Sequence, residues 1–243
     1  KLAVLAVFSI NSGGAALITG DVTTLMIFSS GVVGIADLFA IIVPGLVGCL
    51  LLAAMLMPGF EGRLELERTM IRPSSFDISV AVIFVATILL TLAINLVVHV
   101  PPLLIFMFGL SLVFLLATFM SREEDELPII DYIRKIEFDT LLFFLGILLI
   151  IDMLKEIGTL NSITDLYHQF SPNIANFLIG CISAAIDNVP LTAAVLKSNL
   201  EMPPTAWLGF TYSVGVGGSL LAIGSAAGVL MMSKIEGLGF ISY

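Results

Sequence analysis

Residues 9–21 read SINSGGAALITGD, and residues 213–225 read SVGVGGSLLAIGS. Laid over each other without gaps, the two stretches share a first serine, a pair of adjacent glycines, a leucine and a later glycine, all at the same spacing. Glycine is frequent in membrane helices, so a chance match is the alternative reading. Because the shared spacing is long, we interpret the two stretches as copies of an internal repeat.

The composition around these stretches predicts an all-α, polytopic membrane protein. Of the 243 residues, 58% are hydrophobic and 12% are charged, whereas a soluble domain carries about a quarter charged residues. Apolar runs of about 20 residues, the length that crosses a bilayer as a helix, recur along the chain. The 10 Lys and Arg residues are scattered, which argues against a nucleic-acid partner. The predicted continuous spans are 36–57, 78–98, 103–120 and 138–157.

Charged loops divide the chain into three predicted parts. Residues 1–57 are read as the discontinuous helix and following span of a first repeat, 58–77 as a cytoplasmic linker, and 78–243 as the second repeat. The loops at 59–77 and 121–137 each carry three Lys or Arg residues, which places both on the cytoplasmic side. The chain begins without Met, and we expect it to be part of a longer protein.

Three further apolar stretches are interrupted in their middle. Residues 1–30 are broken at 11–14, and residues 205–233 at 215–219. Residues 174–200 are too long for one span and too short for two, and proline in their centre disturbs a regular helix. This pattern predicts a re-entrant hairpin, with a single kinked helix as the alternative. With the hairpin, the two repeat copies cross the membrane in opposite directions, which is typical of secondary transporters.

Acidic and hydroxyl side chains gather at these interruptions. A helix break at membrane depth persists only where it lines a cavity or a binding site, and a buried ionisable residue there indicates function. Carboxylate, amide and hydroxyl oxygens suit a hard cation such as Na⁺. Removal from water favours the protonated carboxyl group, so a proton and Na⁺ compete for the same oxygens. The sequence therefore predicts exchange of Na⁺ for H⁺ without a cofactor. The candidate binding residues are Asn11, Asp21, Thr23, Thr24, Asp139, Thr140, Ser183, Asp187, Asn188, Ser219 and Ser225, with Na⁺ itself at Asn11, Asp21, Asp187 and Asn188.

Three of these stretches resemble the NhaD-type Na⁺/H⁺ antiporters of the ion transporter superfamily. They are residues 11–24 (NSGGAALITGDVTT), 183–190 (SAAIDNVP) and 217–228 (GGSLLAIGSAAG). The resemblance implies a multi-pass protein of the cell (inner) membrane that exchanges Na⁺, and often Li⁺, for H⁺. It also implies a homodimer with a scaffold and a moving transport unit, and a further hairpin upstream of this chain. Ala222 departs from the resemblance, because the family often has a hydroxyl side chain at that position.

Two other classes of function stay open at this stage. An anion transporter of the same superfamily, for dicarboxylate or arsenite, is expected to carry neutral residues at the hairpin tip, against which Asp187 argues. An intramembrane aspartyl protease would use Asp21 and a second aspartate as an acid–base pair. The repeat has no place in a protease mechanism, so we expect a transporter and not an enzyme.

Overall fold

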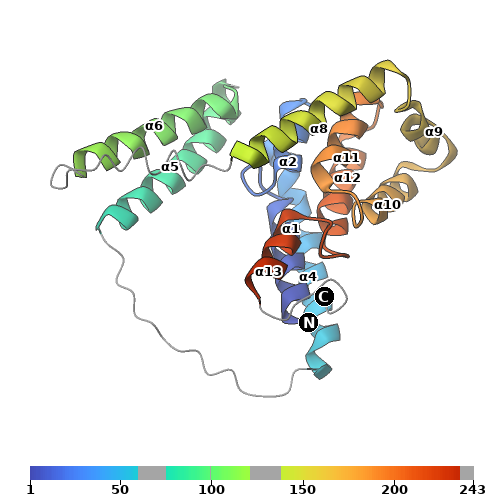
Figure 1. Ribbon diagram of the computed structural model, residues 1–243, viewed down its shortest axis with the longest axis horizontal. Coiled ribbons are helices and arrows are strands. Elements are labelled where there is room, and N and C mark those ends of the chain that lie inside the picture. Colours follow the sequence, from blue (N-terminus) through green and yellow to red (C-terminus); the bar gives the residue numbers. More distant parts are fainter. Residues whose placement is uncertain (60–74, 99, 121–137, 236–243) are drawn as a thin grey trace. The chain divides into compact units, whose positions relative to one another are not determined.

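A computed structural model of the chain describes residues 1–59, 75–98, 100–120 and 138–235 (Figure 1). Within these ranges every regular element is a helix, which agrees with the all-α prediction. The chain divides into two compact units, of which the first comprises residues 1–61 and 142–243 and the second residues 62–141. The predicted loops at 58–77 and 121–137 lie largely outside the described residues.

Three helical segments in the described ranges are long and apolar enough to cross a bilayer, so the membrane prediction is confirmed. Large apolar side chains on these helices point outward, as Val43, Leu50 and Met55 do, and such a surface fits lipid and not water. The fourth predicted span is also a helix, α8 (Phe138–Glu156). The three segments are Ile35–Leu56, which comprises α3 (Ile35–Leu38), the short helix Phe39–Ile41 and α4 (Ile42–Leu56), then Ser75–Asn95 in α5 (Ser75–Val98) and Pro102–Phe119 in α6 (Pro102–Met120).

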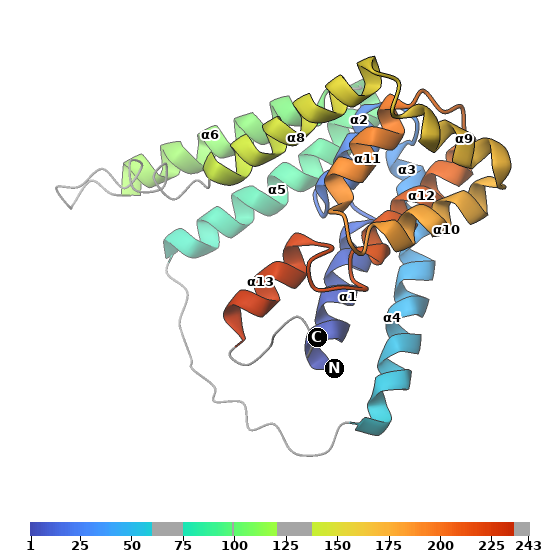
Figure 2. The ribbon, with the colours of Figure 1, turned by 45° about the vertical axis from the view of Figure 1, so that its right-hand side comes forward.

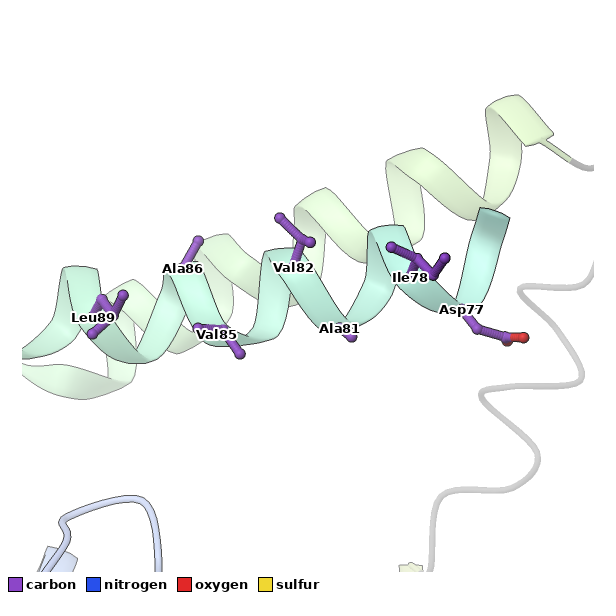
Figure 3. A pocket seen from close by; sticks show the side chains of 7 residues that line it. All are labelled: Asp77, Ile78, Ala81, Val82, Val85, Ala86 and Leu89. Atoms are coloured by element: carbon purple, nitrogen blue, oxygen red, sulfur yellow. The ribbon is translucent and has the colours of Figure 1, made fainter. Parts of the chain in front are cut away.

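The second unit contains a pair of packed helices, α5 and α6. Gly109 of α6 lies against the side chain of Thr87, where a Cβ would overlap it, so the small residue lets the two helices approach closely. The turn between them is held by Asn95, whose Nδ2 donates to the Val100 carbonyl at 3.2 Å. Figure 3 shows an open hollow along α5 that is apolar except for Asp77, so it lacks the polar groups of an ion site.

The first unit is built on two broken helices. Helix α1 (Leu2–Gly14) is followed by turns and then by α2 (Val22–Ser29), and α12 (Pro204–Gly217) is followed by turns and then by α13 (Ala226–Lys234). In Figures 1 and 2 the pair α1–α2 rises from the N-terminus, whereas α12–α13 descends. The two broken helices therefore run in opposite directions, as inverted copies would.

The breaks lie a few residues later than predicted. Helix α1 continues to Gly14 and α12 to Gly217, so the first residues of both glycine-rich stretches are helical, because glycine weakens a helix without ending it. The chain leaves the helix at 15–21 and 218–225. In each copy, the glycine at the start of this loop lies against the glycine six residues later, so the two ends of the loop approach each other closely. A Cβ on Gly14 would lie 2.7 Å from the Gly20 carbonyl oxygen, and one on Gly218 would lie 2.6 Å from the Gly224 oxygen. The shared glycine spacing thus serves the same loop closure in both copies.

The predicted hairpin region consists of two helices and not one kinked helix. Helix α10 (Pro172–Ile182) packs along α12, and α11 (Asn188–Lys197) packs along α2. Pro190 lies in the first turn of α11, where its missing N–H has no helical partner to lose. That the segment re-enters the membrane from one side stays a prediction.

Two contacts join the remaining helices to this arrangement. An apolar cluster centred on Ile151, Leu160 and Ala193 packs α8 against α11. The polar helix α9 (Asn161–Gln169) is attached through Tyr167, whose hydroxyl donates to Asn176 Oδ1 at 2.6 Å, and Asn176 Nδ2 donates to the Ala206 carbonyl at 2.8 Å. Burial raises the pKa of Tyr167, so this hydroxyl keeps its proton and remains a donor.

The contact between α10 and α12 gives a test of the packing. A Cβ at Gly217 would overlap the Gly180 carbonyl oxygen, and one at Gly180 would lie 2.7 Å from the Ser213 oxygen. We expect Gly217→Ala to destabilise the folded protein by about 1–3 kcal/mol, because overpacking forces the helices apart. Gly146→Ala is the matched control, since a Cβ at Gly146 meets nothing within 4 Å.

Thermal unfolding in detergent measures both variants. The packing account predicts a lower unfolding temperature for Gly217→Ala and little change for Gly146→Ala. Equal stability of the two variants would contradict it.

Candidate functional site

The second half of each broken helix begins with a side-chain cap. Asp21 precedes α2 in an extended conformation (φ −147°, ψ 139°), and its Oδ1 accepts the backbone N–H of Thr23 at 3.1 Å. Ser225 precedes α13, and its Oγ accepts the backbone N–H of Gly228 at 3.3 Å. Asp21 and Ser225 are the residues that the repeat aligns. Each satisfies a backbone donor that a helix start leaves free.

The Asp21 carboxylate also joins the first broken helix to α11. Its Oδ2 accepts Nδ2 of Asn188, the first residue of α11, at 3.2 Å. Gly215 of α12 lies close by, since a Cβ there would be 3.9 Å from the same oxygen. A carboxylate offers about four acceptor positions, of which these two hydrogen bonds occupy two. Asp21 therefore keeps lone pairs for a cation or a proton.

The Asn11 side chain links the first broken helix to the second through hydrogen bonds. Its Nδ2 donates to Ser219 Oγ at 3.0 Å and to Ser225 Oγ at 2.9 Å, and all three side chains are buried. Ser225 Oγ thus accepts two hydrogen bonds, which occupy both of its lone pairs. An ion can bind to this oxygen only if one of the two bonds opens.

A second carboxyl group lies at the start of α11. Asp187 is the N-cap residue by position, but its side chain makes no capping hydrogen bond and is partly exposed. The residue after it, Asn188, donates to Asp21 Oδ2, so the chain brings the two acids to the same end of α11. A cation between them would offset the repulsion of the two carboxylates. The N-terminal ends of α2 and α11 carry partial positive charge and also offset it.

Of three other predicted residues, Thr24 and Ser183 have hydroxyls with hydrogen-bond partners, and the Thr23 hydroxyl has none in the described ranges. The Thr24 hydroxyl donates to the Ala15 carbonyl at 3.1 Å, which satisfies a group in the first break. The Ser183 hydroxyl donates to the Val214 carbonyl at 2.9 Å and so attaches the end of α10 to α12. Thr23 is buried, and its hydroxyl lies beside the Asp21 carboxylate without hydrogen-bond geometry. The Thr24 and Ser183 oxygens keep their lone pairs, and the roles of all three residues in ion binding stay predictions.

The structure does not bring every predicted residue together. Hydrogen bonds join Asn11, Ser219 and Ser225 in one group and Asp21 and Asn188 in another, and Gly215 lies close to both groups. Asp139 and Thr140 lie in the first turn of α8, within the second unit, and their role stays a prediction.

Five buried polar residues in the described ranges were not predicted from the sequence, and two of them lie in α10 and α11; the five are Ser12, Thr91, Asn176, Thr192 and Thr211. Asn176 links α9, α10 and α12, and Thr192 lies one turn after Asn188 with a buried hydroxyl that has no partner among the described residues. The spacing of four residues from Asn188 to Thr192 places both on one face of α11 and could have revealed the second.

The donor set of the site favours a hard cation. In the described part of the chain no three His, Cys, Asp or Glu residues are grouped to hold a metal ion. Carboxylate, amide and hydroxyl oxygens are ligands for ions such as Na⁺, and a carboxylate also takes a proton.

Asn11 gives a stability test of the junction. Asn11→Ala removes the donor to both serine hydroxyls, and we expect a loss of about 1–3 kcal/mol because buried polar groups lose their partner. Asn173→Ala, at an exposed asparagine in the first turn of α10, is the control. Thermal unfolding in Na⁺-free detergent solution measures both, and an unchanged unfolding temperature in Asn11→Ala would show that the junction contributes nothing to stability.

Several relatives have named activities. The Na⁺/H⁺ antiporter NhaD of Alkalimonas amylolytica is 34% identical over 95% of this chain and 54% of the relative. The NhaD antiporter of Vibrio cholerae is 32% identical with the same coverage, and sodium/proton antiporter 1 of Arabidopsis thaliana is 32% identical over 59% of this chain and 28% of the relative. The chain thus spans about half the length of the bacterial relatives. No solved structure matches it.

The family profile described as citrate transporter, CitMHS, matches residues 1–235, which is nearly the whole chain. The chain therefore belongs to the citrate transporter (CitMHS) family.

Proposed function

We propose that this chain forms the larger part of the ion path of a Na⁺/H⁺ antiporter. The observation that carries the proposal is the Asp21 carboxylate, which lies at a helix break and is held by Thr23 and Asn188 with acceptor positions to spare. The named activity of the NhaD relatives supports the same choice of ions.

Exchange follows from competition at one set of oxygens. A dehydrated Na⁺ needs several oxygen ligands, and Asp21, Asp187 and Thr23 offer them near the two breaks. A proton on a carboxylate removes the negative charge that holds the cation. Binding of Na⁺ and binding of H⁺ therefore exclude each other, and a site that faces the two membrane sides in turn exchanges one for the other.

The opposed broken helices support alternating access. Two inverted halves can exchange conformations with each other, which opens a fixed site first to one side and then to the other. The direction of α1–α2 relative to α12–α13 fits this scheme (Figure 2). We further propose that the protein acts as a homodimer in the cell (inner) membrane, with Na⁺ and H⁺ as its substrates.

A citrate-like anion is the alternative substrate. The name of the family and the helix N-termini of α2, α11 and α13 near the site favour it, because helix N-termini attract anions. Two acids at the same place oppose a multiply charged anion. The first experiment below separates the two substrates.

Proton flux in liposomes that contain the full-length protein tests the proposed activity. We expect addition of Na⁺ to cause a pH change that falls by about tenfold or more in Asp187→Ala and Asp21→Asn, since each variant removes a charged ligand. Asp165→Ala, at an exposed acid of α9, should retain the flux. Dicarboxylate uptake without Na⁺-driven proton movement would contradict the proposal, and equal flux in Asp187→Ala would remove that residue from the site.

Competition also predicts a pH dependence. As the pH falls, protons occupy more of the carboxylates, so the KM for Na⁺ should rise while the maximal rate at saturating Na⁺ changes less. Initial rates over a range of Na⁺ concentrations at several pH values measure both quantities. A KM for Na⁺ that is independent of pH would exclude competition as the mechanism.

A further inference from the structure

Thr192 has a buried hydroxyl without a partner, one turn beyond Asn188 in α11. Its side chain is fully buried, and its Oγ1 makes no hydrogen bond to any residue in the described ranges. An unpaired buried polar group is unfavourable, and each case in a native protein calls for an explanation such as a bound water or ion.

Four threonines within α5, α6 and α12 behave differently. Each donates its hydroxyl to the carbonyl four residues earlier, at 2.7–2.9 Å, which is the usual way to satisfy a threonine inside a helix. Thr192 has the same option, because the Asn188 carbonyl lies four residues before it, and does not use it. Its hydroxyl is therefore turned away from its own helix backbone. The threonines compared are Thr87, Thr91, Thr118 and Thr211.

Thr192 lies on the same face of α11 as Asn188. Residues four apart lie on one face of a helix, and the Asn188 face of α11 is the one that contacts Asp21. The next residue, Ala193, packs into the apolar cluster with Ile151 and Leu160, which offers no hydrogen-bond partner. Thr192 therefore shares a helix face with Asn188, the residue that donates to Asp21, and not with the apolar cluster.

We propose that Thr192 is a further cation-binding residue, whose hydroxyl oxygen coordinates the ion held beside Asp21 and Asn188. This inference rests on the proposed function. A hydroxyl oxygen is a hard, neutral ligand, so it replaces part of the hydration shell of Na⁺ without adding charge. Thr23 presents a second buried hydroxyl from α2, the helix along which α11 packs.

Thr192→Val tests the proposal, because valine keeps the shape and removes the oxygen. Full-length protein in liposomes should show a KM for Na⁺ raised by about tenfold or more in Thr192→Val, and near the original value in Thr192→Ser. Thr211→Val is the matched control, since Thr211 is equally buried and its hydroxyl already donates to the Trp207 carbonyl. Its KM should not change.

Thermal unfolding distinguishes a ligand from a packing residue. Na⁺ should raise the unfolding temperature of the original protein and of Thr211→Val, and should do so much less in Thr192→Val. Without Na⁺, Thr192→Val should be at least as stable as the original, because it loses only an unpaired hydroxyl. If Thr192→Val does not fold, Thr192→Ala removes the same oxygen and takes its place.

An active exchanger with an unchanged KM in Thr192→Val would overturn the role of Thr192 and leave the proposed function intact. Lower stability without Na⁺, together with an unchanged KM, would identify a packing role and likewise overturn it. Absence of Na⁺-driven exchange in the original protein would overturn the proposed function together with this inference.

Discussion

A helix that breaks inside a bilayer must find partners for the backbone groups that the break releases, and most of the first unit follows from this constraint. Lipid supplies no hydrogen bonds, so the partners have to come from the protein. Asp21 and Ser225 satisfy donors at the start of the second half-helices, and Thr24 satisfies the Ala15 carbonyl within the first break. Because Asn11 also donates to Ser225, satisfying one break connects it to the other. The groups that make the breaks tolerable are therefore the same groups that make a polar site.

Much of this arrangement could be predicted from the sequence, because the residues that form each break are close together in the chain and occur in both copies of the repeat. The aligned glycines close the two loops, and the aligned Asp21 and Ser225 cap the helices that follow. The membrane spans could also be predicted, because the thickness of the bilayer sets the length of the apolar run that a spanning helix needs. The exact breaks could not be predicted, because the sequence does not show how many residues of each glycine-rich stretch stay helical before the helices end at Gly14 and Gly217. Whether a helix continues depends on tertiary contacts such as the one between Gly217 and Gly180.

The polar residues that the sequence missed share a different cause. Thr192 and Asn176 lie inside helices whose sequence pattern does not set them apart. Only the packing of α11 on α2 and of α10 on α12 shows that both side chains are buried. The Ser183 and Thr24 hydroxyls donate to backbone carbonyls and keep their lone pairs, so their roles in ion binding stay predictions. Residue type indicates which side chains could bind an ion, and the hydrogen bonds that an oxygen accepts, two in the case of Ser225 Oγ, decide whether it has a lone pair left to do so.

The central claim is that acidic oxygens at this junction hold either Na⁺ or a proton and never both. Calorimetric titration of the full-length protein with Na⁺, in buffers of different ionisation enthalpy, counts the protons released for each ion bound. The account predicts release of about one proton per Na⁺ where the carboxylates are protonated, falling toward none as the pH rises. Na⁺ binding without proton release at every pH would contradict it.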